Sequence, residues 1–260
     1  MYDWPEVAAD TRRLEAALEA EVLTRLSVSG AAATPWPKDL DLFGRWRDPG
    51  LMLSQSCGYP LMTELHGAVV PVLTPHYTVP GCDGPYYRSI LLARRDDGAA
   101  TLADMAGRQA AINGRDSQSG YNAFRHAVAA IAPPGPFFQD VIETGSHLAS
   151  LRAVACGKAD VCSIDPVCWA LAQRHHGEMA ERLAPVGMTA AAPGLPFVTS
   201  AARSAGEIAA IRAAALSVLS APDLQDVRDR LFLNGCSVLA TDSYSIILEM
   251  KASGEAAHVM

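Results

Sequence analysis

Hydrophobic residues recur along this chain with two periods, one typical of strands and one typical of helices. Short apolar runs at 108–113, 137–144 and 159–165 predict strands, and a segment with helical spacing follows each run. The three expected helices end near residue 131 or span 145–157 and 166–177. Because parallel strands need a crossover between them, this alternation predicts a doubly wound α/β sheet.

The flanking segments carry further elements. Leucine and valine side chains four residues apart predict an amphipathic helix over 11–26. Apolar, β-branched runs predict strands over 68–78 and 88–97. A serine three residues before a glutamate forms a capping box and predicts a helix over 204–220. Shorter elements are expected at 50–62, 101–107 and 223–233, and residues 184–200 are expected to be extended.

Neither flank forms a complete α/β unit alone, so we expect two lobes. The first lobe would combine residues 1–92 with 195–260, and the second would comprise 105–185. Two connections near 93–104 and 186–194 would join them. A cleft between two such lobes is a common place for a small ligand.

Three strand-to-helix junctions of the second lobe carry polar residues. A helix start offers free backbone N–H groups and the positive end of the helix dipole, which together favour an anion. Alternatively, the serines are only N-caps, the histidine is structural or a general base, and the aspartate caps its helix instead of holding an amine. The candidate ligand-binding residues at the junctions are Ser117, Gln118, Ser119, Gly120, Ser146, His147 and Asp165.

Two loops of the expected outer lobe, 54–60 and 81–87, combine glycine, polar groups and tyrosine. Tyr59, Tyr86 and Tyr87 would supply a flat wall and a hydroxyl group to a cleft. The alternative is that both loops are surface turns in which the tyrosines only pack.

Composition excludes several classes of function. The net charge of −7 argues against a nucleic-acid surface. No apolar run reaches the roughly 20 residues that span a bilayer. No secretory signal begins the sequence, so we expect a periplasmic or extracellular protein if a signal was removed and a cytoplasmic one if this start is native.

Neither a metal-binding cluster nor a cofactor motif is found, and the six cysteines form no CxxC. They are expected to be free thiols, although Cys57 and Cys82 could pair in an oxidising compartment.

Several motifs resemble the PhnD-like phosphate/phosphonate-binding proteins, the solute-binding components of ABC importers. The resemblance covers about residues 40–215 and is carried by SQSCGYP, GCDGPYYRS, LADMAG, SQSG, TGSHLASLRAVACGKADVCSID and PGLPFVTS. It implies a type II periplasmic-binding-protein fold, in which two α/β lobes close on the ligand. By the resemblance, Ser117, Gln118, Ser119, Ser146 and His147 would hold the phosphonate oxygens, Asp165 would hold an amine, and Tyr59 with Tyr86 or Tyr87 would line the cleft. Gln118 departs from the family, which has a small hydroxyl residue there.

The sequence therefore predicts a non-catalytic protein that binds a small anionic or zwitterionic ligand, without a cofactor, for an ABC permease. The alternatives are a cytosolic enzyme and a ligand sensor on the same fold. Paired catalytic carboxylates, a nucleophile elbow and a nucleotide-binding loop are not found in the sequence, so catalysis has no direct support.

Overall fold

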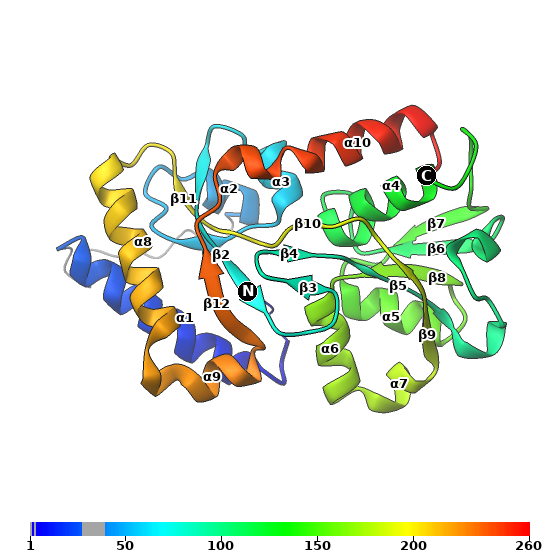
Figure 1. Cartoon of the computed structure of the whole chain (residues 1–260), viewed down its shortest axis with the longest axis horizontal. Helices are drawn as coiled ribbons and strands as arrows, with labels where there is room; N and C mark the ends of the chain where they lie inside the picture. The colour runs from blue at the N-terminus through cyan, green and yellow to red at the C-terminus, as the bar shows by residue number, and fades with distance from the viewer. Residues whose placement is uncertain (1, 3, 28–39) are drawn as a thin grey trace. The chain divides into compact units, whose positions relative to one another are not determined.

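The computed structural model describes residues 2, 4–27 and 40–260, which divide into two compact units (Figure 1). Unit 1 comprises Met1–Thr78 and Pro193–Ser243, and unit 2 comprises Val79–Ala192 and Tyr244–Met260. The chain therefore passes between the units three times.

These boundaries differ from the expected lobes in two places. β5 (Ile90–Arg94) belongs to unit 2, because β8 (Val161–Ile164) and β9 (Leu183–Met188) pair with its two edges. The C-terminal helix α10 (Ile246–Ala257) also belongs to unit 2, because it packs on α4 (Ala123–Ala129). The passage between residues 192 and 193 falls within an expected connection.

Unit 2 is built on a five-stranded sheet of order β7-β6-β8-β5-β9. The parallel sheet expected from the sequence forms in its centre, where β6 (Gln109–Ile112) runs parallel to β7 (Asp140–Glu143) and to β8. β5 runs antiparallel to both of its neighbours, so the whole sheet is mixed. Between β5 and β6 the chain forms only two short 3₁₀ turns, Arg95–Asp97 and Leu102–Met105, instead of a crossover helix.

Helices cover both faces of this sheet. In Figure 1, α4 and α10 lie on one side, and α5 (His147–Ala155), α6 (Pro166–His175) and α7 (Gly177–Glu181) lie on the other. Alternate residues of a strand point to opposite faces, so Ala110 and Ile112 of β6 share one core with Phe124 of α4. The expected helices over 145–157 and 166–177 are thus present with slightly shorter bounds.

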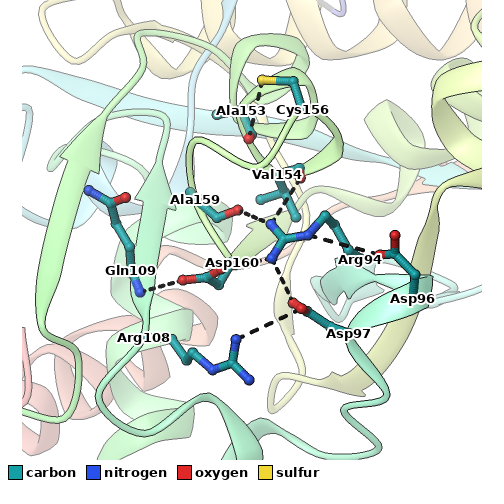
Figure 2. Close-up of polar contacts among 10 residues, drawn as sticks. All are labelled: Arg94, Asp96, Asp97, Arg108, Gln109, Ala153, Val154, Cys156, Ala159 and Asp160. Carbon is teal, nitrogen blue, oxygen red and sulfur yellow. Dashed lines mark hydrogen bonds and ion pairs between the residues drawn. The ribbon is translucent and has the colours of Figure 1, made fainter.

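A polar network fixes the edge at which β6 and β8 begin (Figure 2). The Asp160 carboxylate accepts a hydrogen bond from the backbone N–H of Gln109 at 2.9 Å and another from Arg94 at 2.9 Å. Arg94 also donates to Asp97 at 3.0 Å and to the carbonyl of Ala159 at 2.8 Å. The G-x-A-D motif at 157–160 therefore joins the end of α5 to two strands.

Unit 1 contains an antiparallel sheet of order β1-β11-β2-β12. Its strands are β1 (Ser54–Gln55), β11 (Phe197–Ser200), β2 (Val69–Tyr77) and β12 (Leu233–Ser237). Its helices are α1 (Ala8–Arg25), α2 (Leu42–Arg47), α3 (Gly58–Met62), α8 (Ala205–Ser220) and α9 (Gln225–Arg230). The capping box at the start of α8 is confirmed, because the Ser204 hydroxyl accepts from Glu207 N and the Glu207 carboxylate accepts from Ser204 N.

Two observations bear on the expectations from composition. Within the described part of the chain, no single helix is long and apolar enough to cross a bilayer, and α8 with 222–230 passes that test only as a pair bent by 64°. None of the six cysteines, all of which lie in the described part of the chain, forms a disulfide, so the pairing considered for Cys57 and Cys82 is not present.

Candidate oxyanion-binding site

The first predicted junction follows β6 and begins the helical segment that leads into α4. Ser117 caps it, because its hydroxyl accepts the backbone N–H of Gly120 at 3.0 Å. Asn122 N then donates to the carbonyl of Ser117 at 2.9 Å, a five-residue spacing that makes Gln118–Asn122 a π-turn. Such turns are rare and often occur at functional sites.

The second junction follows β7, the parallel neighbour of β6. Ser146 caps α5 by accepting from Ala149 N at 3.1 Å, and His147 is the first residue of that helix. The preceding Gly145 has a φ of +86°, a left-handed conformation that a side chain would strain. This turn lets β7 pass directly into a helix that starts with a histidine.

The two junctions meet at one pair of side chains. Ser119 Oγ lies 2.9 Å from His147 Nε2, although the two residues are 28 positions apart in the sequence. Ser163 of β8 donates to the carbonyl of Ser119 at 2.6 Å, so a third strand supports the same turn. The convergence follows from the parallel pairing, because the carboxyl ends of parallel strands lie at one edge of the sheet.

His147 is the electrostatically distinctive residue of this site. The side chain is only half-buried as a whole, yet the protein atoms around its ring desolvate the imidazole and lower its pKa to about 4. The ring is therefore neutral at pH 7. Among the described residues its buried Nδ1 has no hydrogen-bond partner. An unpaired buried nitrogen costs on the order of 1–3 kcal/mol, so its retention needs an explanation.

A residue that the sequence analysis did not select, Asn113, also belongs to this site. A Cβ atom at Gly120 would lie 1.8 Å from Asn113 Oδ1 and 3.2 Å from His147 Cε1, so the glycine is required for this close approach. Asn113 Oδ1 is buried and likewise lacks a hydrogen-bond partner within the described chain. The sequence could have pointed to Asn113 through its position directly after β6, because that position lies at the same sheet edge as the serines.

Gln118 requires a correction. The sequence suggested that its side chain holds an oxyanion, but the structure turns it toward the C-terminal helix. Gln118 Nε2 donates to the sulfur of Met250 at 3.1 Å, and Gln118 Oε1 accepts from Asn122 at 2.7 Å. The residue is completely buried in these contacts.

For Asp165, the structure shows the capping role that the sequence left as an alternative. Its Oδ1 atom accepts the backbone N–H groups of Val167 at 2.8 Å and of Cys168 at 3.2 Å, at the start of α6. The residue is buried. Burial, followed by the charge of Asp165, raises the pKa of the Cys82 thiol to about 12, so that thiol is not ionised at neutral pH.

The three candidate tyrosines are divided between the units. Tyr59 is buried in α3 of unit 1, whereas Tyr86 and Tyr87 belong to unit 2 in the short strand β4 (Tyr86–Tyr87). Neighbouring strand residues point to opposite faces, and accordingly Tyr86 is 41% exposed while Tyr87 is buried. Tyr86 is the tyrosine of unit 2 that is open to a ligand.

A serine beside a histidine can act as a nucleophile and base, and in known triads a third group orients the imidazole. His147 Nδ1 has no such partner among the residues that the structure describes. Within the same residues, no three His, Cys, Asp or Glu side chains cluster as metal ligands.

Comparison with known proteins identifies the family. Residues 51–244 match the family described as "ABC transporter, phosphonate, periplasmic substrate-binding protein". Among curated proteins, none matches this chain.

Solved structures with the same fold include PhnD1 from Prochlorococcus marinus in complex with methylphosphonate, with a TM-score of 0.75, 11% identity, and coverage of 96% of this chain and 94% of that one. The binding-protein component PA3383 of a phosphonate transporter from Pseudomonas aeruginosa has a TM-score of 0.73 and 15% identity, covering 95% of this chain and 82% of that one. XAC2383 from Xanthomonas citri, bound to ATP, has a TM-score of 0.70 and 18% identity, and the match covers 92% of this chain and 91% of that one. The chain thus has the two-lobe type II fold of periplasmic binding proteins, and it belongs to the family of phosphonate-binding substrate-binding proteins of ABC transporters.

Proposed function

We propose that this protein captures a small phosphorus oxyanion, a phosphonate or a phosphate ester, and delivers it to an ABC permease. The observation that carries the proposal is the contact between Ser119 and His147 at 2.9 Å, which joins two helix starts at one point. Family membership supports a non-catalytic, solute-binding role. The family is described as periplasmic, and we place this protein's action there.

The donors at this site are neutral. Hydroxyl groups of Ser117 and Ser119 and the backbone N–H groups of the two helix starts would hydrogen-bond the ligand oxygens. The Nε2–H of neutral His147 would donate to Ser119 Oγ and so leave the serine proton for the ligand. Each hydrogen bond to a charged oxygen contributes about 1.5–3 kcal/mol. Three or four of them supply most of the roughly 8 kcal/mol that a micromolar dissociation constant requires.

The capping role of Asp165 refines the ligand class. Its Oδ1 atom already accepts two backbone hydrogen bonds, so an amine on the ligand gains less there than the resemblance implied. We therefore propose that the oxyanion group dominates recognition, with the exposed Tyr86 of the same unit contacting the substituent. Under this proposal, 2-aminoethylphosphonate binds no more tightly than methylphosphonate.

Isothermal calorimetry with methylphosphonate, 2-aminoethylphosphonate, phosphate and a phosphate monoester tests the function. We expect Ser119→Ala to weaken the best ligand by about 10- to 100-fold, because it removes one hydrogen bond to a charged oxygen. Unit 1 offers a matched control, since Ser237 Oγ lies 2.8 Å from His76 Nε2 in a second serine–histidine pair. Ser237→Ala should leave the affinity unchanged.

Two results would contradict the proposal. One is the absence of binding tighter than about 1 mM for every member of the panel. The other is equal weakening by Ser119→Ala and Ser237→Ala, which would mean that the affinity follows general stability and not the site.

A further inference from the structure

Two completely buried polar side chains, Gln118 and Asn122, are not used by the proposed ligand contacts. Both lie in the π-turn that carries Ser119, and both contact α10. Asn122 Nδ2 donates to Gln118 Oε1 at 2.7 Å and to the carbonyl of Ile247 at 3.0 Å. Gln118 Nε2 donates to Met250 at 3.1 Å. We call these four residues the α10 contact.

The α10 contact is not the arrangement that stability alone would favour. Ile247 and Met250 are also buried, so apolar partners would suit them. Asn122 Oδ1 is buried without a hydrogen-bond partner among the described residues, which costs on the order of 1–3 kcal/mol. Buried polar groups of this kind are retained in some proteins because they fix one register between packed elements.

The geometry links this register to the ligand site. Gln118 and Ser119 are consecutive residues of the π-turn, so anchoring the Gln118 side chain on α10 fixes the direction in which Ser119 points. Ser119 in turn contacts His147, and the backbone carbonyl of Ser117 accepts the hydrogen bond that makes the turn a π-turn. A turn released from α10 could relax to regular α-helical bonding, which would rotate Ser119 away from His147.

We propose that the α10 contact positions Ser119 for oxyanion binding, and that Gln118 and Asn122 are positioning residues. This inference rests on the proposed function. At position 118 the side chain would hold the turn and not the ligand.

The test compares Gln118→Leu with a matched control on the same helix pair. Gln118→Leu removes both polar contacts at similar volume. Val128→Ala removes two buried methyl groups from the core under α4, six residues beyond Asn122. Calorimetry with methylphosphonate gives the affinity, and thermal unfolding gives the stability. The NMR chemical shift of His147 Cε1–H, measured without ligand, reports whether Ser119 still lies beside the imidazole.

We expect Gln118→Leu to weaken methylphosphonate binding by about 5- to 20-fold and to shift the His147 signal, with little change in melting temperature. Val128→Ala should lower the melting temperature and leave affinity and signal unchanged. The inference is overturned if Gln118→Leu binds within twofold of the wild type with an unmoved signal, or if Val128→Ala weakens binding equally.

A second variant covers the case in which Gln118→Leu does not fold. Met250→Leu keeps the core volume and removes only the sulfur acceptor, so a weaker effect in the same direction supports the inference, and unchanged affinity and signal overturn it. Failure of the wild type to bind any oxyanion would count against the proposed function, and the ligand-free NMR comparison would still decide the inference.

Discussion

At the residue scale, the neutral state of His147 is central to how the site works. Its Nε2 contacts a hydroxyl, and its Nδ1 is buried without a partner in the described chain. A charged ring would attract an anion but would pay a large desolvation penalty, which is why burial lowers the pKa to about 4. Under the proposed function, the site would bind its ligand through the direction of its hydrogen bonds and not through a full positive charge.

The same pKa predicts how stability depends on pH. The folded pKa of His147 is about 4, below the ordinary value of 6.5, so the unfolded chain binds the proton more tightly. The contribution of neutral His147 to stability is complete above pH 6.5 and is lost as the pH falls from 6.5 to 4. Thermal unfolding of the ligand-free protein should therefore show a steeper loss of melting temperature over this range for the wild type than for His147→Gln.

Other groups titrate in the same range, so the difference between the two proteins is the relevant quantity. Equal slopes for wild type and His147→Gln would show that the imidazole is not desolvated as described. Ser220→Ala removes an exposed hydroxyl that donates to backbone carbonyls of α8, and it serves as a control that should keep the wild-type slope.

At the element scale, the two ends of β6 differ in their contacts. The carboxyl end leads through Asn113 to the candidate site, whereas the amino end is fixed by Asp160 (Figure 2). Burial opposes ionisation of Asp160, yet the hydrogen bonds from Gln109 N and from Arg94 lower its pKa overall. The G-x-A-D motif is thus a structural clamp on the strands that carry the site.

Removing this clamp should affect stability more than binding. Asp160→Asn weakens the hydrogen bonds to Gln109 N and to Arg94, so we expect a loss of about 2 kcal/mol in the free energy of unfolding, measured by urea denaturation. Asp96 provides the control. Its Oδ1 atom lies 4.0 Å from Arg94 Nε, but its side chain is 87% exposed. Asp96→Asn should therefore lower the free energy of unfolding by less than about 0.5 kcal/mol. Equal effects of the two substitutions would contradict the clamp.

At the scale of the whole molecule, the negative net charge of the chain disfavours the anionic ligand that the candidate site would bind. The chain carries a net charge of −7, which repels an anionic ligand, while the candidate donors are neutral. Salt screens the long-range repulsion but has little effect on short hydrogen bonds inside a buried turn. The affinity of this protein should therefore respond to ionic strength differently from that of a site built on arginine or lysine.

Calorimetry at different ionic strengths tests this expectation. Between about 50 mM and about 500 mM sodium gluconate, the dissociation constant for methylphosphonate should stay constant or decrease slightly. Gluconate is chosen because a small anion such as chloride could compete for the site. A tenfold weakening over this range would instead indicate that a cationic side chain dominates binding.

The sequence by itself determined the features that depend on near neighbours in the chain. The alternation of apolar runs located β6, β7 and β8 of unit 2 and the helices that follow them, and the serine caps at Ser117, Ser146 and Ser204 have the predicted hydrogen bonds. Because parallel strands end at one edge, the meeting of Ser119 and His147 could also be expected from the order of the elements. Caps and crossovers are local rules, so a single sequence contains them.

Only the tertiary structure decided where several of the same side chains point. Gln118 faces Met250, 132 residues further along the chain, and no local pattern contains that pairing. β5 pairs antiparallel with two strands that lie far from it in the sequence. The C-terminal helix α10 contacts unit 2 through the carbonyl of Ile247, which accepts a hydrogen bond from Asn122. These outcomes depend on which buried surfaces meet, and that is a property of the packed chain as a whole.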